Sequence, residues 1–220
     1  MQGYKLHVTF YSPCVFYHRP ILDSILSYCL QRESQNHLGY YAGTWRDREF
    51  EGINRLPEVI AFQREIPMTT FLQYGGNIPV YMDSWKKRFE PKHVHLADFG
   101  KARRRIDTTS GQYRSFNMPL SAKVIQDGWF GFIGDGERVL ELMNRWIWAI
   151  GKKPSEGFGV IDSIRLEPWV CAAKDILALR PVPIDVAKEW ELNGIEQFCA
   201  WRPPYWGRRN HARCIVPAEA

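Results

Sequence analysis

Residues 151–159 combine glycine, lysine and an aromatic residue in a pattern that suits binding of a phosphodiester backbone. The stretch reads Gly-Lys-Lys-Pro-Ser-Glu-Gly-Phe-Gly. Backbone N–H groups beside glycine are not shielded by Cβ atoms, two ammonium groups attract phosphate, and the phenylalanine offers a face for a base or ribose. The order of elements is reversed from that of a nucleotide-binding P-loop. A plain turn from a helix into a strand would explain the same glycines.

A second candidate for polyanion binding is the basic segment from Lys86 to Arg114. It holds nine Lys or Arg against three Asp or Glu, whereas the rest of the chain has 20 basic and 21 acidic residues. Within it, residues 100–107 and 112–116 flank Thr-Thr-Ser-Gly, which predicts a projecting β-hairpin. Charge confined to one segment favours nucleic acid over a merely solvated surface.

The C-terminal stretch 200–209 mixes Trp, Tyr and Arg with two prolines. Arginine beside aromatic rings suits base stacking and cation–π contact. Aromatic residues next to Pro-Pro also close the ends of hydrophobic cores, so both interpretations stay open. The candidate nucleic-acid contacts in this stretch are Arg202, Tyr205, Trp206, Arg208 and Arg209.

Residues for catalysis are sparse. His93 and His95 share a strand face, but they lie in the basic segment where carboxylate co-ligands are few, so we expect neither a metal nor another cofactor. No nucleophile elbow, HExxH or paired-carboxylate motif is present. A metal-independent ribonuclease needs only a residue that activates a 2′-hydroxyl and a cation that stabilises the developing charge. His18, His37, Tyr40 and Tyr41 are candidates for that alternative.

The elements that position these residues alternate between strands and helices. Hydrophobic patterning predicts strands at 4–10, 59–62, 68–72 and 160–166, and helices at 20–33 and 139–150 closed by Gly151. The order βαββαβ is that of an α+β, ferredoxin-like domain. We expect this domain over residues 1–168, with the basic hairpin inserted at about 86–130. Residues 169–220 form a C-terminal extension on the same domain, with helices near 172–179 and after 185 and a strand at 214–216.

Composition indicates a soluble cytoplasmic protein without a membrane partner. No apolar run approaches the ~20 residues that cross a bilayer, and no signal segment leads the chain. The five cysteines are scattered and never form a CxxC pair, so we expect reduced thiols.

Several of these stretches resemble the RAMP superfamily of CRISPR-associated proteins, the proteins of guide-RNA-directed antiviral defence. The resemblance lies in the early strand, in the helix that begins at Pro20 and above all in the glycine loop 151–160. Residues 105–111 and 202–206 resemble the small backbone subunit of type IV effector complexes, the type IV member of the fifth Cas family.

This resemblance implies a non-catalytic subunit with a ferredoxin-like RNA-recognition core that grips the 5′ handle of the guide RNA (crRNA). It implies a position at one end of the backbone filament beside the large subunit, where contact with target DNA is also expected. The implied RNA contacts of the glycine loop are Lys152, Lys153, Ser155, Gly157, Phe158 and Gly159. Those of the hairpin are Lys101, Arg103, Arg104, Arg105, Tyr113 and Arg114, and further candidates are Tyr17, His18 and Arg19.

Overall fold

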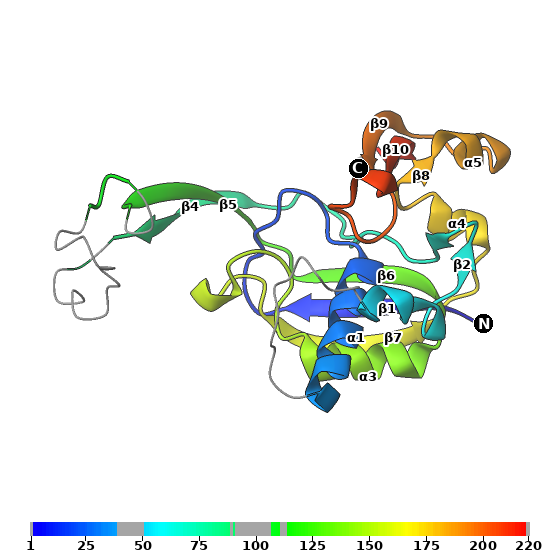
Figure 1. The fold of residues 1–220 in the computed structure, drawn as a ribbon, viewed down its shortest axis with the longest axis horizontal. Coiled ribbons are helices and arrows are strands. Elements are labelled where there is room, and N and C mark those ends of the chain that lie inside the picture. The colour runs from blue at the N-terminus through cyan, green and yellow to red at the C-terminus, as the bar shows by residue number, and fades with distance from the viewer. Residues whose placement is uncertain (1, 39–50, 89, 91–106, 111–113, 219–220) are drawn as a thin grey trace.

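The computed structural model describes residues 2–38, 51–88, 90, 107–110 and 114–218. Helices and antiparallel strands both contribute, so the expected α+β class is confirmed. A three-stranded sheet lies at the centre, a two-stranded hairpin extends away from it, and a smaller sheet is formed near the C-terminus (Figure 1).

The central sheet has the strand order β6–β1–β7, and both pairs are antiparallel. Its strands are β1 (Gln2–Phe10), β6 (Asp127–Gly134) and β7 (Ile161–Pro168). Residues 69–73 follow the other edge of β6 through antiparallel bridges from Thr69 to Phe132 and from Gln73 to Trp129. The first and last predicted strands are therefore confirmed.

Neither of the predicted central strands, 59–62 and 68–72, forms a regular strand, although Ile60, Thr69 and Gln73 make isolated antiparallel bridges to β6. Between and beside them lie the two-residue strands β2 (Phe62–Gln63) and β3 (Ile66–Pro67). The long strand that the prediction missed is β6, which follows the hairpin in sequence. Three glycines in β6 lower its β-propensity, and tertiary pairing with β1 overrides that local preference.

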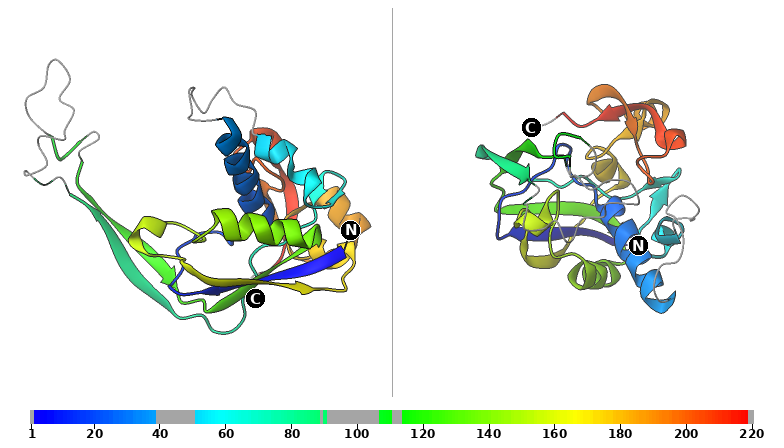
Figure 2. Two further views of the ribbon diagram at one scale, coloured as in Figure 1. Left: turned by 90° about the horizontal axis from the view of Figure 1, so that it is seen from below. Right: turned by 60° about the vertical axis from the view of Figure 1, so that its left-hand side comes forward.

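Two helices pack on one face of the central sheet (Figure 2). They are α1 (Leu22–Leu38) and α3 (Gly136–Trp146), and the α3 residues Val139, Leu142 and Met143 are buried. Leu6, Val8 and Phe10 of β1 face the same core. Burial of each large apolar side chain contributes about 2 kcal/mol, and this explains why the alternating strand and the amphipathic helix pack together.

The ends of both helices differ from the prediction. α3 ends at Trp146, not Ile150, because Ala149 bridges Val160 and the Ile150 amide donates to the Gly159 carbonyl at 2.8 Å. Gly151 therefore does not close the helix but lies in a turn that follows it, where it has a positive φ of 113°. The predicted loop at 34–55 is partly helical, since α1 continues to Leu38 and is followed by α2 (Glu51–Asn54) and η1 (Leu56–Glu58). His37 lies in α1, but its side chain and residues 40 and 41 are outside the described part.

A hairpin is present, but apart from Phe116 its described strands lie outside the predicted arms 100–107 and 112–116, which stay a prediction. β4 (Val80–Lys87) pairs with β5 (Phe116–Lys123) without interruption from Val80↔Lys123 to Lys87↔Phe116. The hairpin leaves the body on the side away from the C-terminal sheet (Figure 1). Most residues of the predicted arms, including 100–106 and 112–113, are outside the described residues.

The C-terminal part forms a second antiparallel sheet with the order β8–β10–β9. Its elements are α4 (Ala173–Leu177), β8 (Val182–Pro183), α5 (Ile184–Glu189), β9 (Ile195–Ala200), η5 (Arg208–Asn210) and β10 (His211–Val216). Both predicted helices and the final strand are confirmed. Ile66 and Met68 of the N-terminal part pack into the hydrophobic core of this region.

A buried ion pair links the C-terminal part to the start of α1. Arg180 lies 3.1 Å from Asp23, and both side chains are fully buried. Arg180 also donates to the carbonyls of Pro67 and Trp201, while the Tyr205 hydroxyl donates to Asp23 at 2.8 Å. Burial, then the Asp23 charge, raises the pKa of Tyr205 well above its ordinary value and keeps this donor protonated.

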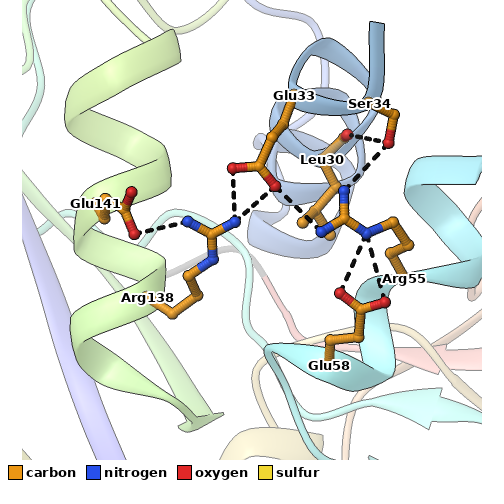
Figure 3. A network of polar contacts seen from close by, with 7 residues as sticks. All are labelled: Leu30, Glu33, Ser34, Arg55, Glu58, Arg138 and Glu141. Carbon is orange, nitrogen blue, oxygen red and sulfur yellow. Dashed lines mark hydrogen bonds and ion pairs between the residues drawn. The ribbon is translucent and has the colours of Figure 1, made fainter. Parts of the chain in front are cut away.

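A second polar network joins the two helices (Figure 3). Glu33 of α1 accepts hydrogen bonds from Arg138 of α3 at 2.6 Å and from Arg55 at 3.1 Å. Glu141 and Glu58 hold the other sides of the two guanidinium groups. Burial alone would raise the pKa of Glu33, but the hydrogen bonds and charges of Arg138 and Arg55 outweigh it, so the pKa is lowered.

The buried pair predicts a large loss of stability for Arg180→Ala. This substitution leaves Asp23 buried without its cation, which typically costs about 3–5 kcal/mol. Arg213→Ala is the control, because Arg213 forms an exposed pair with Glu196 that contributes under about 1 kcal/mol. Urea unfolding followed by circular dichroism measures both. Equal losses in the two variants would contradict the assigned role of the buried pair.

The lowered pKa of Glu33 predicts pH-dependent stability. At pH 7 Glu33→Gln should lower the free energy of unfolding by about 1–3 kcal/mol, since it removes charged hydrogen bonds. Because the folded-state pKa lies below the ordinary 4.5, the contribution is complete above that value and is lost as pH falls through the folded pKa. Urea unfolding of both proteins at pH 7 and pH 3 measures this. A difference that does not shrink at pH 3 would refute the assignment.

Candidate nucleic-acid interface

Three segments far apart in sequence meet beside the base of the hairpin. The Lys152 amide of the glycine loop donates to the Val15 carbonyl at 2.7 Å, and the Gly159 amide donates to Pro13 at 2.8 Å. Cys14 in turn exchanges backbone hydrogen bonds with Lys123 at the end of β5. Here this meeting point is called the junction surface, and it consists of Tyr17, Arg19, Tyr74, Trp85, Lys123, Lys152 and Lys153.

The glycine loop is folded on itself around a single 3₁₀ turn, η4 (Pro154–Glu156). The amides of Glu156 and Phe158 donate to the Lys153 carbonyl, and the Gly157 amide donates to Pro154. Most of the backbone donors that were expected to face a phosphate are therefore occupied within the protein. The charge of the loop comes from its lysine side chains.

Both lysines of the loop are held over aromatic rings. The Lys152 ammonium lies 3.8 Å from the centre of the Tyr17 ring, and the Lys153 ammonium lies 2.8 Å from the centre of a Trp85 ring. Such contacts contribute about 0.5–1 kcal/mol each at exposed sites. They restrain the two ammonium groups without neutralising them, because among the described residues neither lysine has a carboxylate partner.

Phe158 does not present the open face that the sequence suggested. Its ring is 8 % exposed and packs with Val15, Leu120 and Ala122 in a small core under the hairpin. It anchors the loop to the hairpin, and this corrects its expected role as a stacking residue. Ser155 and Gly157 are exposed in the same loop, whereas Gly159 is buried.

The loop before α1 adds a second row of cations and rings. The Arg19 guanidinium lies 4.8 Å from the centre of the Tyr74 ring, and the Lys123 ammonium lies 5.1 Å from Phe16 and 3.4 Å from the Tyr74 hydroxyl. Tyr17 is 59 % exposed, and His18 is also exposed. The structure thus brings Tyr17 and Arg19 together with Lys152 and Lys153.

Three residues of the junction surface were missed by the sequence analysis. Trp85 directly precedes the basic run 86–88, and this neighbourhood is a signal that could have identified it. Lys123 and Tyr74 carry no comparable local signal. Lys123 reaches the site through the register of β5, and Tyr74 reaches it through the path of the segment 73–79.

Few of the predicted hairpin contacts are described. Lys101, Arg103, Arg104, Arg105 and Tyr113 lie outside the described residues, whereas Arg114 is exposed. Nearby, Asp107 accepts hydrogen bonds from the Ser110 hydroxyl and from the Thr109 hydroxyl and amide. The Ser110 hydroxyl has the largest effect, followed by Thr109, and together these hydrogen bonds hold the pKa of Asp107 well below its ordinary value. The Asp107 carboxylate therefore adds a negative charge to this otherwise basic stretch of the sequence.

The C-terminal candidates divide into two groups. Arg202 donates to Asn210 and to Glu65 and lies 4.6 Å from the Trp201 ring, while Tyr205 bonds Asp23. The contacts of Arg202 and Tyr205 stabilise the fold, and this favours the structural interpretation for both residues. Trp206, Arg208 and Arg209 are exposed in the loop and the 3₁₀ turn between β9 and β10.

No described residues form a metal-binding group. Within the described ranges, no cluster of three His, Cys, Asp or Glu side chains is present, and His93 and His95 are outside those ranges. The five cysteines are free thiols, and three of them are buried. None of the described helices is both long and apolar enough to span a membrane.

The loop geometry predicts different outcomes for two glycine substitutions. Gly157 and Gly159 both have positive φ, at 87° and 67°. A Cβ at Gly157 would meet nothing within 4 Å, whereas one at Gly159 would overlap the Ile150 carbonyl. Gly157→Ala should therefore cost only the backbone strain of about 1–2 kcal/mol. Gly159→Ala should cost clearly more, as measured by urea unfolding. Equal losses would contradict this description of the loop.

No curated protein matches the chain. One family model, described as CRISPR type IV associated protein Csf3, matches residues 77–217. The matched region contains the hairpin, the glycine loop and the C-terminal sheet, and it covers more than half of the 220 residues. The expected relation to a type IV CRISPR-associated protein is thereby confirmed, and the chain belongs to the Csf3 family.

Proposed function

We propose that this protein is a non-catalytic guide-RNA-binding subunit of a type IV CRISPR ribonucleoprotein. The junction surface holds the 5′ handle of the guide, and the hairpin extends the contact. The observation that carries this proposal is the convergence of four cations and three aromatic rings from four segments: the loop before α1, the stretch around Tyr74, the hairpin and the glycine loop. Among the described residues, none of the four cations has a carboxylate partner.

Cations that gather on one surface without carboxylate partners create a local positive potential. Lys123, Lys152 and Lys153 together make such a potential beside the hairpin, and it attracts an anionic partner. A nucleic-acid backbone supplies the missing negative charge and releases its bound counterions. Tyr17 and Trp85 add ring faces, and base stacking on aromatic side chains contributes about 1–3 kcal/mol per base.

The topology supports a ferredoxin-like core of the RAMP type. Read across the sheet, the order is β7, β1, β6 and residues 69–73, all antiparallel. In chain order these are the fourth, first, third and second strands, with α1 and α3 on one face. This is the arrangement that a βαββαβ core requires. The proposed RNA site lies at one end of this sheet.

Assembly with other subunits is part of the proposal. The hairpin extends beyond the body of the molecule, as an element that reaches a neighbouring subunit or a nucleic acid would (Figures 1 and 2). We propose the backbone filament subunit and the large subunit as its neighbours, with target DNA as a further contact. In such complexes base pairing reads the target, and the protein holds the RNA backbone.

Two alternatives make different demands on the same residues. A metal-independent endoribonuclease would require a general base such as the exposed His18 beside the bound RNA. A purely architectural subunit would use the junction surface for protein contacts and would bind isolated RNA only weakly. The aromatic rings that accompany every cation of the junction surface favour an RNA contact over a purely architectural role. A nuclease would share this RNA contact, so a cleavage assay is what separates it from the proposed function.

The proposal predicts that Lys152→Ala/Lys153→Ala weakens binding of single-stranded, repeat-containing RNA about tenfold or more. Two phosphate contacts would be lost, so the slope of log K against log salt should fall by about 1.4, at ~0.7 per contact on single strands. Fluorescence anisotropy with labelled RNA at several salt concentrations measures both quantities.

The matched control is Lys174→Ala/Lys188→Ala, which removes two lysines near the C-terminal sheet. It should leave the affinity and the slope nearly unchanged. Equal losses in the two double variants would show only a general charge effect. An unchanged slope for the glycine-loop variant would remove these lysines from the site.

A further inference from the structure

A second basic and aromatic cluster lies where α1 and α3 come together. Two guanidinium groups lie near the Trp146 ring of α3, with Arg32 of α1 at 5.7 Å and Arg145 at 5.2 Å from its centre. Trp148 follows two residues later and is 59 % exposed. Here Arg32, Arg145, Trp146 and Trp148 are called the helix-end patch.

The arginines of this patch differ from two other arginines near α1 and α3. Arg138 of α3 and Arg55, which precedes η1, are neutralised by Glu33, Glu58 and Glu141 (Figure 3). Arg32 and Arg145 are exposed, and within the described residues neither has a carboxylate partner. The Trp146 ring thus orients the Arg32 and Arg145 guanidinium groups, whose N–H donors remain accessible to a ligand.

The exposed Trp148 side chain is carried by a fixed backbone. The Ile161 amide donates to the Trp148 carbonyl at 2.9 Å, and the next residue, Ala149, bridges Val160. Exposure of so large an apolar ring to water is unfavourable. The backbone pairing with β7 nevertheless holds Trp148 at the surface. An indole on a rigid support suits stacking against a base.

The patch is continuous with the junction surface along the chain. Only three residues separate Trp148 from Lys152, and seven positions separate Arg145 from Lys152. Even a fully extended chain spans at most about 25 Å over seven residues. The end of α3 therefore lies within about 25 Å of the glycine loop, a distance that a few nucleotides of single-stranded RNA span.

We propose that the helix-end patch is a second contact for single-stranded RNA, which extends the bound guide from the glycine loop toward α1. The inference rests on the proposed function and adds the direction and length of the RNA path. Arg32 and Arg145 bind phosphates, and Trp148 stacks on a base. An acidic segment of a protein partner is the competing occupant, but it would not explain the continuity with the unpaired lysines of the junction.

The test compares short and long RNA with one double variant, Arg32→Gln/Arg145→Gln. Anisotropy is measured with unstructured RNA of about 6 and about 20 nucleotides. The variant should bind the short RNA normally and the long RNA about tenfold more weakly, with a salt slope lower by about 1.4. Trp148→Ala should also weaken only the long RNA. The control is Arg165→Gln/Arg213→Gln, which removes two exposed arginines of β7 and β10.

The possible results separate this inference from the proposed function. Normal binding of the long RNA by the patch variant, together with loss of binding by the glycine-loop variant, would overturn the inference and leave the proposed function intact. If the wild-type protein binds neither RNA, both fail. Normal RNA binding with loss of co-purification of the other complex subunits would assign the patch to a protein partner and overturn the inference. Thermal melting of each variant confirms that the fold is retained.

Discussion

The buried contact between Arg180 and Asp23 is the constraint on which the arrangement of this molecule depends. Two opposite charges have left water completely, and such a pair needs further hydrogen-bond partners to be stable. The Pro67, Thr69 and Trp201 carbonyls and the Tyr205 hydroxyl supply these partners, so four distant segments must meet. Only the Nε of Arg180 finds no partner among the described residues. Asp23 lies in the first turn of α1, and the contact therefore fixes where that helix begins.

The position of α1 determines the junction surface. At the start of the helix, the Leu22 amide donates to the Thr70 carbonyl, and the Leu72 amide donates to the Pro20 carbonyl. These two hydrogen bonds fix the direction in which the preceding loop leads into α1. Further back, the same loop holds the glycine loop through Pro13 and Val15. Phe158 and Leu120 then fill the space under the hairpin. Buried groups thus do the positioning, and the lysines remain at the surface with their charge available to a polyanion.

How much the sequence predicts depends on how local each signal is. The first and last strands, α1, α3 and the C-terminal helices follow from periodicity within one segment and are confirmed. β6 was missed because its glycines lower local propensity, while its pairing with β1 depends on residues more than 100 positions away. The end of α3 was misplaced because Ile147 and Ile150 continue the apolar period, whereas backbone pairing with residues 159–161 stops the helix.

The same distinction holds for the candidate site. Lys152 and Lys153 could be selected from composition and spacing, since glycine and lysine lie side by side in the chain. Trp85, Tyr74 and Lys123 come to the site through hairpin register and loop course, which no local pattern encodes. Phe158 appeared to be a free ring because its burial depends on Val15 and Leu120, and both are far from it in sequence.

The central claim is that this protein binds guide RNA and leaves it intact. The most direct measurement is incubation of the purified protein with labelled repeat-containing RNA in EDTA, analysed on a native gel for retardation and on a denaturing gel for cleavage. Binding through the junction surface predicts a retarded band of full-length RNA. Specific cleavage without metal would contradict the claim in favour of a nuclease, and an unretarded, intact RNA would contradict it in favour of an architectural subunit.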